Sequence, residues 1–540
     1  MFNLLILLSA LWLFWEIKYV LFWIFLWQLK DYHMARLVDH FRTSKGKKII
    51  FDGVQILKLV LLILFLAAGQ IFNYLLYVLI LVYLAELALF LKGILTKSVR
   101  SPVKTLKTLF LTATSFVVVL LFMAWVAVVK GLIQPALFLG FDILTPVIIS
   151  VIVLLVQPLF VLMRRRTLKK AENKMEEIKN ASHVKVIAIT GSYGKTSTKE
   201  FLTTILSKKF NVLSTKDHQN SEIGVAKCVL KDLKPSHQIF IAEVGAYDKG
   251  KVKEVCNMIK PEIGIVTGVN EQHLALFGSL DNLLSAEGGR ELADALPKDG
   301  ILFVNGDNKY CLDLYKRTGN INKKIYSLSN KAIDSDIWSD SITVGKDSIS
   351  FLAIDKAGEM MHFEAKVLGK QNVQNLLGAI LVAKELGMSF GEISEACKNI
   401  FQEQAGMTLK QEKHGIDIID SSYSSNPDGV FADLEYLKVF NGKKVVVMPC
   451  LIELGEKSAE IHEKIGRKIG EVCDLAIVTS KDKFKELEKG FNETKKQGTK
   501  CVLCDKAQDV YSMITLFCST GDAVLLEGRV PQKLIDLLLK

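Results

Sequence analysis

The sequence predicts two parts of different fold class. The first is an N-terminal α-helical transmembrane bundle, and the second is an α/β protein with a doubly wound central domain and a smaller, Rossmann-like C-terminal domain. Mean hydropathy is +0.28, and the long apolar stretches gather before residue 165. After Val184, short apolar runs alternate with amphipathic segments, a pattern typical of a parallel sheet covered by helices. The predicted boundaries are 1–163 for the bundle, 164–182 for a linker helix, 183–406 for the central domain and 407–540 for the C-terminal domain.

Five stretches of the N-terminal part are long and apolar enough to cross a bilayer, which takes about 20 residues. They are residues 2–27, 54–69, 71–91, 109–129 and 132–163, and counts of four or six stay open. The first stretch does not match a signal peptide, because no basic segment precedes it and no small-residue cleavage site follows it. Lys58 and Glu86 fall inside spans, where charge is costly; each is either functional or a helix-end residue that reaches the interface.

Basic residues in the connections predict the orientation of the spans. The second connection has no lysine or arginine and the fourth has only Lys130, whereas the first, the third and the exit from the last span are rich in both. These residues are Lys30, Arg36, Arg42, Lys45, Lys47 and Lys48, then Lys92, Lys97, Arg100, Lys104 and Lys107, then Arg164, Arg165 and Arg166. Because basic loops stay on the cytoplasmic side, we expect a multi-pass protein of the cytoplasmic (inner) membrane with its N-terminus outside and its α/β domains in the cytoplasm. These clusters hold much of the net charge of +11, so it does not indicate a nucleic-acid partner.

The segment 184–198 predicts a site for a nucleoside triphosphate. A strand pattern at 184–189 ends in a glycine turn, and a helix-forming run follows. This order surrounds a phosphate with backbone N–H groups and a helix N-terminus, with a lysine beside it. The residues expected at the phosphates are Gly191, Ser192, Tyr193, Gly194, Lys195, Thr196 and Ser197, with the Thr196 hydroxyl on Mg²⁺. Ile189 stands where the standard motif has a glycine, and the alternative is a chance Gly-Lys-Thr in a loop.

Further strand patterns at 239–244, 263–269 and 301–304 extend the predicted sheet, and the nucleotide should bind at their carboxyl ends. Glu243 closes the first of these strands, and His273 follows the second. A carboxylate and an imidazole near the Thr196 hydroxyl would make a shell for Mg²⁺. Each of the two residues alone is more often a plain surface residue, and it is their order in the chain that favours the site.

A series of short segments, together with the phosphate loop, resembles the Mur ligase family, the ATP-dependent amide ligases that build cell-wall peptides. The segments are Asn220–Val225, Glu243–Ala246, His273–Leu280, Asn305–Asn308, Asn372–Asn375, Asp420–Pro427 and Glu453–Glu456 with His462. They are similar to the family's Asn-x-x-Ile-Gly, Glu-Leu-Gly-Ala, His-Leu…Phe-Gly-Ser, Asn-x-Asp-Asn, second Asn pair, Asp-Asp-Ser-Tyr-Asn-Ala-Asn-Pro and Leu-Gly-Glu segments. The resemblance covers about residues 184–540 and is closest to the branch that adds D-alanyl-D-alanine.

The resemblance implies a two-step ligation that uses ATP and Mg²⁺. A substrate carboxylate attacks the γ-phosphate to give an acyl phosphate, and an amine then displaces phosphate. The implied catalytic residues are Lys195, His273 and Glu287, and the implied metal ligands are Thr196, Glu243, His273 and Glu287. Besides the phosphate loop, the implied nucleotide residues are Asn305, Asp307, Asn372, Asp420, Tyr423 and Asn426. The implied partners are a carboxylate-bearing cell-wall peptide precursor and an amino acid or dipeptide, with D-alanyl-D-alanine as the expected amine.

Departures from the family pattern lie mostly on the substrate side. Glu287 stands at the family's carbamylated lysine, which bridges metal, and it could hold a metal directly, through water or not at all. Gln371, Met407, Ser421 and Glu527 replace a histidine, an arginine, an aspartate and a lysine of the family pattern. Membrane helices also occupy the place of the family's UDP-sugar-binding domain.

The preferred interpretation is a membrane-anchored Mur-type ligase of peptidoglycan precursor synthesis, with the lipid bilayer as a partner. Two alternatives stay open. One is a poly-γ-glutamate synthetase-like ligase, and the other is an ATP-binding membrane scaffold that recruits other cell-wall enzymes and has lost ligation. All nine cysteines follow residue 227, in the part expected in the reducing cytoplasm, so disulfides are not expected. The pair Cys501 and Cys504 lacks the second pair that a zinc site needs.

Overall fold

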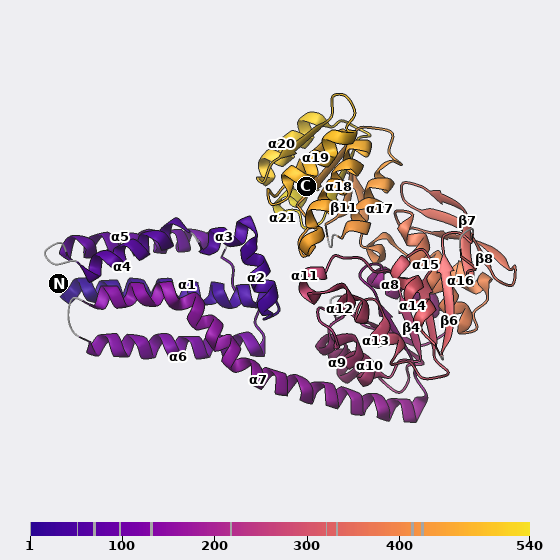
Figure 1. Cartoon of the computed structure of the whole chain (residues 1–540), viewed down its shortest axis with the longest axis horizontal. Coiled ribbons are helices and arrows are strands. Elements are labelled where there is room, and N and C mark those ends of the chain that lie inside the picture. The colour runs from indigo at the N-terminus through magenta and orange to yellow at the C-terminus, as the bar shows by residue number, and fades with distance from the viewer. Residues whose placement is uncertain are drawn as a thin grey trace. The chain divides into compact units, whose positions relative to one another are not determined.

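The computed structural model describes residues 2–50, 52–67, 72–96, 99–129, 133–216, 219–319, 321–330, 333–411, 415–422 and 426–539. The chain divides into two compact units, Met1–Arg165 and Arg166–Lys540 (Figure 1). Long apolar helices make up the first unit and two α/β domains the second, so the fold class predicted from the sequence is confirmed.

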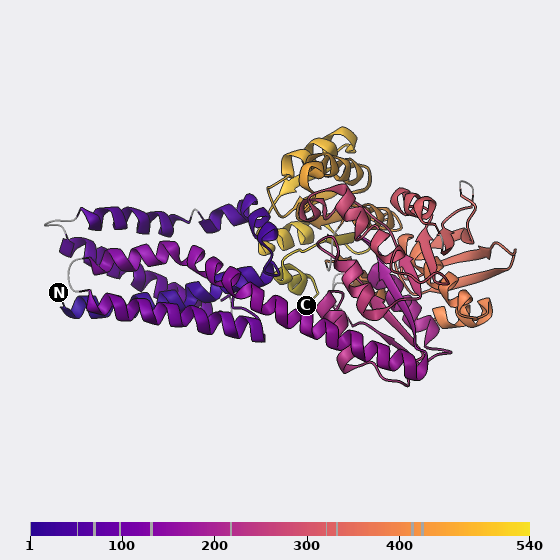
Figure 2. The ribbon, with the colours of Figure 1, turned by 60° about the horizontal axis from the view of Figure 1, so that its bottom comes forward.

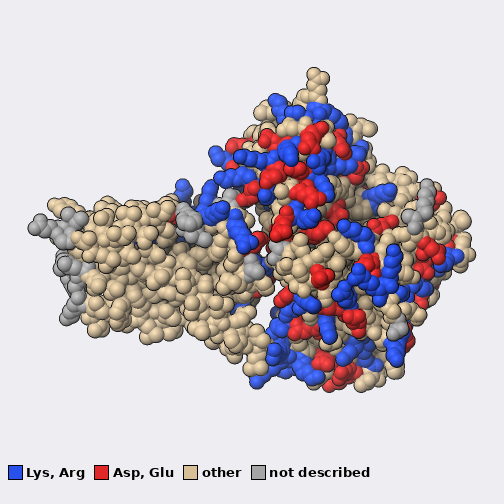
Figure 3. Space-filling model, viewed as in Figure 1, with Lys and Arg blue, Asp and Glu red and all other residues tan. Residues whose placement is uncertain are grey.

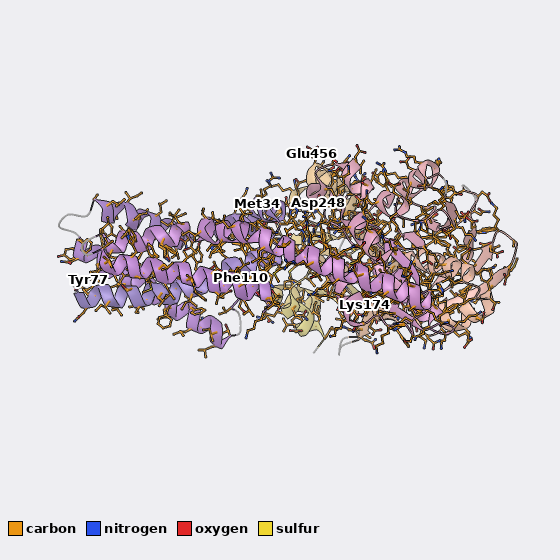
Figure 4. All side chains as sticks on the ribbon, turned by 90° about the horizontal axis from the view of Figure 1, so that it is seen from below. Met34, Tyr77, Phe110, Lys174, Asp248 and Glu456 are labelled. Carbon is orange, nitrogen blue, oxygen red and sulfur yellow. The ribbon has the colours of Figure 1, made fainter. Side chains whose placement is uncertain are left out.

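Four of the long helices of the first unit, α1 (Phe2–Leu29), α4 (Gly53–Leu66), α5 (Phe72–Leu95) and α6 (Leu106–Val128), are apolar on every side, as expected of segments that face lipid. Tyr77 and Phe110 are among its exposed hydrophobic side chains (Figure 4), and the face seen in Figure 3 is almost free of charge along the bundle. Among the described residues, five helical segments are long and apolar enough to cross a bilayer: Asn3–Leu29, Gly46–Leu66, Phe72–Leu95, Leu106–Val128 and Gln134–Ser182. The other helices are α2 (Met34–Arg42), α3 (Ser44–Ile50) and α7 (Gln134–Ser182), and the helices are drawn from two directions in Figures 1 and 2.

The last predicted span and the predicted linker helix form one continuous helix, α7. Pro146 and Pro158 lie inside this helix without ending it, although neither has an N–H for the carbonyl four residues earlier. Beyond Arg165 the helix packs on the second unit. Met175 belongs to the apolar core there, and the Lys174 ammonium (Figure 4) donates to the Leu230 carbonyl at 2.9 Å.

The central domain is built on a nine-stranded sheet in the order β2-β3-β1-β4-β5-β6-β7-β8-β9. The strands from β2 to β7 are parallel, and β8 and β9 complete the edge in antiparallel pairing. The strands are β1 (Lys185–Thr190), β2 (Val212–Ser214), β3 (Ile239–Glu243), β4 (Ile263–Val266), β5 (Ile301–Asn305), β6 (Asn322–Ser327), β7 (Ile337–Val344), β8 (Ile349–Asp355) and β9 (Met360–Ala365).

Helices cover both faces of this sheet because successive strand residues point to opposite sides. Along β1, Ala188 belongs to one buried apolar layer and Ile187 to the other. One layer is completed by α8 (Lys195–Leu206), α15 (Gln371–Glu385) and α16 (Phe390–Cys397). The opposite layer is completed by α9 (Glu222–Lys231), α10 (Lys251–Ile259), α12 (Leu280–Ser285), α13 (Arg290–Ala293) and α14 (Lys309–Arg317), with the short α11 (Leu274–Phe277) nearby in sequence.

The C-terminal domain has a six-stranded sheet in the order β10-β11-β15-β12-β13-β14, parallel except for β10. Its strands are β10 (Thr408–Gln411), β11 (Asp417–Ser421), β12 (Lys444–Met448), β13 (Leu475–Val478), β14 (Lys500–Leu503) and β15 (Ala523–Glu527). Its helices are α17 (Pro427–Leu437), α18 (Ser458–Val472), α19 (Phe484–Thr494), α20 (Ala507–Phe517) and α21 (Gln532–Leu538), with the 3₁₀ turn η3 (Gly455–Lys457); η2 (Gln402–Ala405) precedes the domain. A doubly wound sheet of this kind leaves its strand ends free to bind ligands.

Candidate active site

The glycine turn connects the carboxyl end of β1 to the N-terminus of α8. Gly191 and Gly194 have φ angles of +143° and +77°. A Cβ atom on Gly191 would lie 2.3 Å from Thr267 Oγ1, and one on Gly194 would lie 2.6 Å from Asn375 Oδ1. Only glycine therefore fits at both positions. A tight turn of this kind presents backbone N–H groups and a helix N-terminus to a phosphate.

The residues inside the turn are fixed by their neighbours. The Lys195 ammonium lies over the loop and donates to two of its carbonyls, at 2.5 and 3.3 Å. The Tyr193 hydroxyl accepts from Asn308 Nδ2 at 3.2 Å. The Tyr193 ring covers Gly268 so closely that a Cβ atom there would lie 2.3 Å from Cζ. Ser197 lies in the first turn of α8. The loop is thus held from the side of β4 and β5.

Thr196 and Glu243 meet at the ends of neighbouring strands β1 and β3. The Thr196 hydroxyl donates to Glu243 Oε1 at 3.1 Å, and Asn220 Nδ2 donates to the same oxygen at 3.0 Å. The ammonium of Lys199, which is fully buried, lies 3.7 Å from Glu243 Oε2 and 2.9 Å from Glu200 Oε1. The buried Glu243 carboxylate is therefore oriented from three sides.

A second acidic pair lies on the other side of the turn. Glu287 is 1% exposed, and its two oxygens bond to His273 Nδ1 at 2.9 Å and to Ser192 Oγ at 2.8 Å. Burial acts to raise the pKa of Glu287, but the contact with His273, the charge of Lys195 and the hydrogen bond from Ser192 outweigh it and lower the pKa. The carboxylate is thus ionised at neutral pH and tied to the phosphate loop.

The four predicted metal ligands therefore form two pairs, Thr196 with Glu243 and His273 with Glu287. Among the described residues, no group of three or more His, Cys, Asp or Glu side chains is arranged to hold a metal ion. Mg²⁺ in phosphate sites usually takes only one or two carboxylates and fills its shell with phosphate oxygens and water. The hydroxyl of Thr196 and the carboxylate of Glu243 fit that requirement.

The predicted nucleotide residues of the central domain form a connected network. Asn305 Nδ2 donates to the Thr267 carbonyl at 2.7 Å, and its oxygen accepts from Gln374 at 2.9 Å. Asp307 accepts from the same Gln374 amide at 2.6 Å. Asn372 stands apart from this network: its side chain donates to the Leu368 carbonyl, just before α15, at 2.8 Å and accepts from Asn375 Nδ2 at 3.1 Å. Asn305 and Asp307 thus join β5 to α15, next to the loop that follows β4.

The C-terminal domain reaches the phosphate loop through Asn270. The Asn270 side chain donates to Asn426 Oδ1 at 3.2 Å and to Asp428 Oδ2 at 2.7 Å, and its backbone N–H donates to Ser192 Oγ at 3.2 Å. Asn426 also caps α17 by accepting from the Gly429 N–H. Burial raises the pKa of Asp428, and the hydrogen bond from Asn270 partly opposes that rise.

The other predicted residues of the C-terminal domain are less tied to the site. Asp420 accepts from the N–H and the hydroxyl of Ser422, at 3.1 and 2.5 Å, and lies 3.8 Å from Lys410 Nζ. These contacts all lie within the C-terminal domain. Tyr423 lies outside the described residues.

Several of the departures from the family pattern gather in a buried cluster of the C-terminal domain. The Ser421 hydroxyl donates to one oxygen of Asp433 at 2.5 Å, and Gln371 Nε2 donates to the other at 3.2 Å. Glu527 is 1% exposed and contacts Asp433, and burial together with that neighbour raises the pKa of Glu527 far above its ordinary value. Met407 is buried in the apolar core of this domain. The cluster is thus made of carboxyl and neutral polar groups.

Three residues of the site were missed by sequence reasoning. Asn270 directly follows the strand predicted over 263–269, so the strand-end position that singled out Glu243 could have found it. Gln374 stands between two asparagines that had been noted, on the exposed side of α15. Lys199 gave no signal, because a lysine one turn into a helix is usually solvent-exposed. The strand predicted over 263–269 ends at Val266, since Thr267 and Gly268 bond the phosphate loop at Tyr193 and Ser192.

Comparison with known proteins agrees with this geometry. Residues 189–383 match the Mur ligase middle domain, and residues 407–530 match the Mur ligase glutamate ligase domain. The UDP-N-acetylmuramoyl-tripeptide–D-alanyl-D-alanine ligase of Escherichia coli (strain K12) is 29% identical over 282 residues, which are 52% of this chain and 61% of that protein. The ligase of the same name from Buchnera aphidicola (subsp. Acyrthosiphon pisum) is 27% identical over 337 residues, 62% of this chain and 72% of that protein. This chain therefore spans less than two thirds of the length of the first relative.

A crystal structure of MurF from Acinetobacter baumannii superposes with a TM-score of 0.62 at 23% identity, over 69% of this chain and 80% of that one. This likeness shows a shared fold. The two matching domains make up more than half of the chain and contain every residue of the phosphate loop. The chain belongs to the Mur ligase family of ATP-dependent, amide-bond-forming ligases.

Proposed function

We propose that this chain is a membrane-anchored amide ligase of peptidoglycan precursor synthesis, with D-alanyl-D-alanine as its amine substrate. The observation that carries the proposal is the glycine turn flanked by two buried glutamates, Glu243 bonded to Thr196 and Glu287 bonded to His273. The names of the two sequence relatives, which pair UDP-N-acetylmuramoyl-tripeptide with D-alanyl-D-alanine, support the choice of substrates.

The proposed reaction has two displacement steps. A carboxylate oxygen of the precursor attacks the γ-phosphorus of ATP, the bond to the bridging oxygen breaks, and ADP leaves with that electron pair. The amine nitrogen then attacks the acyl carbon, loses a proton, and phosphate leaves. Charge collects on the phosphate oxygens in both steps, and the Lys195 ammonium over the glycine turn would neutralise part of it.

Mg²⁺, when bound, would supply positive charge against the phosphate oxygens. Thr196 and Glu243 would hold it, and Asn220 and Lys199 would keep the Glu243 carboxylate aimed at the loop. At the place of the family's carbamylated lysine, Glu287 offers a carboxylate that needs no CO₂. We propose that Glu287 and His273 serve a second Mg²⁺ or orient Ser192 of the loop.

The remaining nucleotide contacts are assigned to Asn305, Asp307, Asn372, Asp420, Tyr423 and Asn426. In this proposal the central domain comprises residues 183–406 and binds ATP, and the C-terminal domain, residues 407–540, completes the site. The bonds from Asn270 to Asn426 and Asp428 support a role for the C-terminal domain close to the phosphates. Movement of that domain would control access and exclude water.

We further propose that residues 1–163 anchor the enzyme in the cytoplasmic membrane, followed by the linker 164–182. The N-terminus would lie outside and the ligase domains inside, where ATP is available. This orientation places the basic connections, which are the first, the third and the exit from the last span, on the cytoplasmic side. Because helices replace the sugar-binding domain, the carboxylate substrate would be presented at the membrane in a lipid-linked form. Full activity of a helix-free fragment on the soluble UDP-linked peptide would contradict that last point.

One observation favours a second function. Within the part of the chain that the structure describes, the contacts of Asp433 and Glu527 include no lysine or arginine, whereas the family pattern has a lysine in place of Glu527 and an aspartate in place of Ser421. A scaffold that binds ATP, recruits cell-wall enzymes to the membrane and no longer ligates would tolerate that change.

The deciding experiment is phosphate release by the detergent-purified full chain with Mg-ATP. The assay is run with and without UDP-N-acetylmuramoyl-tripeptide, and with and without D-alanyl-D-alanine. The products are identified by mass spectrometry. We expect phosphate release that depends on both substrates, together with a new amide product. Lys195→Ala should lose both the phosphate release and the product. ATP binding without product from these substrates, and from a lipid-linked tripeptide, would reject the ligase and leave the scaffold.

A further inference from the structure

Four of the long apolar helices place ionisable side chains at one point inside the first unit. Lys58 of α4 lies with its ammonium 2.8 Å from Glu86 Oε2 of α5 and 2.7 Å from Asp142 Oδ2 of α7. The Tyr83 hydroxyl donates to the same Asp142 oxygen at 2.9 Å. Glu16, in the middle of α1, accepts from the Thr145 hydroxyl at 2.6 Å. Lys58, Asp142 and Glu16 are all 0% exposed.

This arrangement leaves two carboxyl oxygens with neither a hydrogen-bond donor nor an ion-pair partner. Glu16 Oε2 and Asp142 Oδ1 are buried and have no hydrogen-bond partner among the described residues, and Glu86 Oε2, which also lacks one, lies 2.8 Å from the Lys58 ammonium. Thr145, which bonds Glu16, lies one turn after Asp142 on α7, so its bond brings the Glu16 and Asp142 carboxyls together. Two carboxylates in contact inside an apolar bundle repel strongly, and a proton between them turns the repulsion into a hydrogen bond.

The sum of the charges in this buried cluster also favours a bound proton. Glu16, Glu86 and Asp142 carry three negative charges when ionised, and within the cluster Lys58 supplies one positive charge. Of the nearby groups, Lys18 is half-buried and shares the Trp15 ring with Lys58, their ammonium groups lying 4.6 and 4.0 Å from its centre. The other titratable neighbours on these helices are Tyr19 of α1, Tyr83 of α5 and, before α4, Asp52. Even with Lys18 counted, one negative charge is left uncompensated, and such a charge is costly at this depth.

We propose that the helical bundle contains a proton-binding site, in which Glu16 and Asp142 share one exchangeable proton and Lys58 holds the outer oxygen of Asp142. The occupant is a proton and not a divalent metal ion, because the described residues include no group of three ligating side chains arranged around a metal. Loss of the proton places two adjacent negative charges between α1 and α7, so the packing of these two helices depends on protonation. The site does not depend on the ligase function and stands or falls separately from it.

The test is infrared spectroscopy of the full chain in detergent, in the region where protonated carboxyl groups absorb. Wild type minus Glu16→Gln, and wild type minus Asp142→Asn, should each show a carboxylic-acid band that shifts in D₂O. In wild type alone this band should disappear reversibly as the pH is raised. Buried acids of the ligase domains cancel in these differences, and Glu527→Gln serves as the matched control that removes a different band.

Each outcome decides the proposal. A band that is lost in both variants and titrates in wild type supports it. Where one variant fails to fold, the difference spectrum of the other carries the assignment, with the Glu527 band identified by its own variant. Difference spectra without a carboxylic-acid band at any pH would overturn it. A band that NaCl removes and choline chloride does not would also overturn it, since the occupant would then be Na⁺. As an independent check, the hydrophobic reagent dicyclohexylcarbodiimide, which reacts with protonated carboxyls in apolar surroundings, should label Glu16 or Asp142 at low pH and not at high pH.

Discussion

Beside the phosphate loop, two buried carboxylates have partners that stabilise negative charge. Glu243 accepts a side-chain N–H and lies near a lysine, and Glu287 contacts a histidine. In the C-terminal domain, the buried carboxyl of Glu527 faces another carboxyl, that of Asp433. The first region stabilises ionised carboxylates, which can bind a positively charged ligand, and the second region stabilises protonated carboxyls. The two regions therefore differ in electrostatics: one favours ionised carboxylates and the other favours protonated carboxyls.

The largest effect is expected from Lys195→Ala, which removes the charge that distinguishes the first region. Loss of a group that stabilises developing phosphate charge typically costs about 100-fold or more in turnover. Phosphate release from Mg-ATP in the presence of both substrates measures it. Lys209→Ala is the matched control, because Lys209 is a half-exposed lysine that bonds the Gly387 carbonyl, away from the loop. Retained turnover in Lys195→Ala would place the catalytic site elsewhere.

The next prediction concerns Glu287 as a stand-in for a carbamylated lysine. Glu287→Gln should lower turnover about 10- to 100-fold, the usual range for a group that supports a metal or its ligands. Wild-type activity should not change when bicarbonate is added or removed, whereas Glu287→Lys should gain a dependence on bicarbonate. A wild-type requirement for bicarbonate would show that Glu287 does not hold this place in the site.

A smaller effect is expected where the two regions meet, at Asn270. Removing its amide breaks the bonds to Asn426 and Asp428 and leaves the phosphate loop intact. Asn270→Ala should lower kcat about tenfold, in line with the loss of a hydrogen bond to a charged group, with little change in ATP affinity. Nucleotide binding and turnover, measured side by side, check this split.

A double-mutant cycle of Asn270→Ala with Asp428→Asn tests whether the bond itself is responsible. Coupled residues give non-additive changes. Additive changes would mean that Asn270 acts on the loop alone and that the contact between the domains has no part in turnover.

Four strands of the central domain, β1, β3, β4 and β5, could be predicted from the sequence because their signals are local. A strand followed by a glycine turn and Lys-Thr specifies the loop within a few residues, and strand-end positions pointed to Glu243. What could not be predicted depends on which helix faces meet. Lys199 is buried only because α8 packs on the sheet, and the contact of Glu527 with Asp433 joins residues far apart in the chain.

In the helical bundle, too, the contacts between helices could not be predicted from the sequence. Lys58 and Glu86 could be singled out as charges inside spans, and the open choice was between a functional role and a helix-end residue. The structure buries both side chains, pairs them with each other and adds Asp142 as a second partner of Lys58. Hydropathy fixes where a span lies along the chain, but it does not fix the rotation of the helix, so the convergence of four helices had no signal in the sequence.

The smallest effect is expected from the second region and appears as a dependence of stability on pH. A glutamate in an unfolded chain has a pKa of about 4.3, and burial beside Asp433 raises the pKa of Glu527 well above that value. The folded protein thus keeps a proton that the unfolded chain releases once the pH exceeds about 4.3. Folding stability from this group is complete below that pH and falls as the pH rises toward the raised pKa.

Glu527→Gln removes the charge and keeps the shape, so it should stabilise the C-terminal domain at about pH 8 by about 1–3 kcal/mol and have little effect at about pH 4. Urea unfolding of the full chain in detergent at both pH values measures the difference. Glu493→Gln, at an exposed glutamate paired with Arg467, is the matched control and should not show this pattern. If Glu527→Gln destabilises the domain most at high pH, Glu527 is ionised and paired in the folded protein. The contrast between a region that stabilises ionised carboxylates and one that stabilises protonated carboxyls would then be wrong.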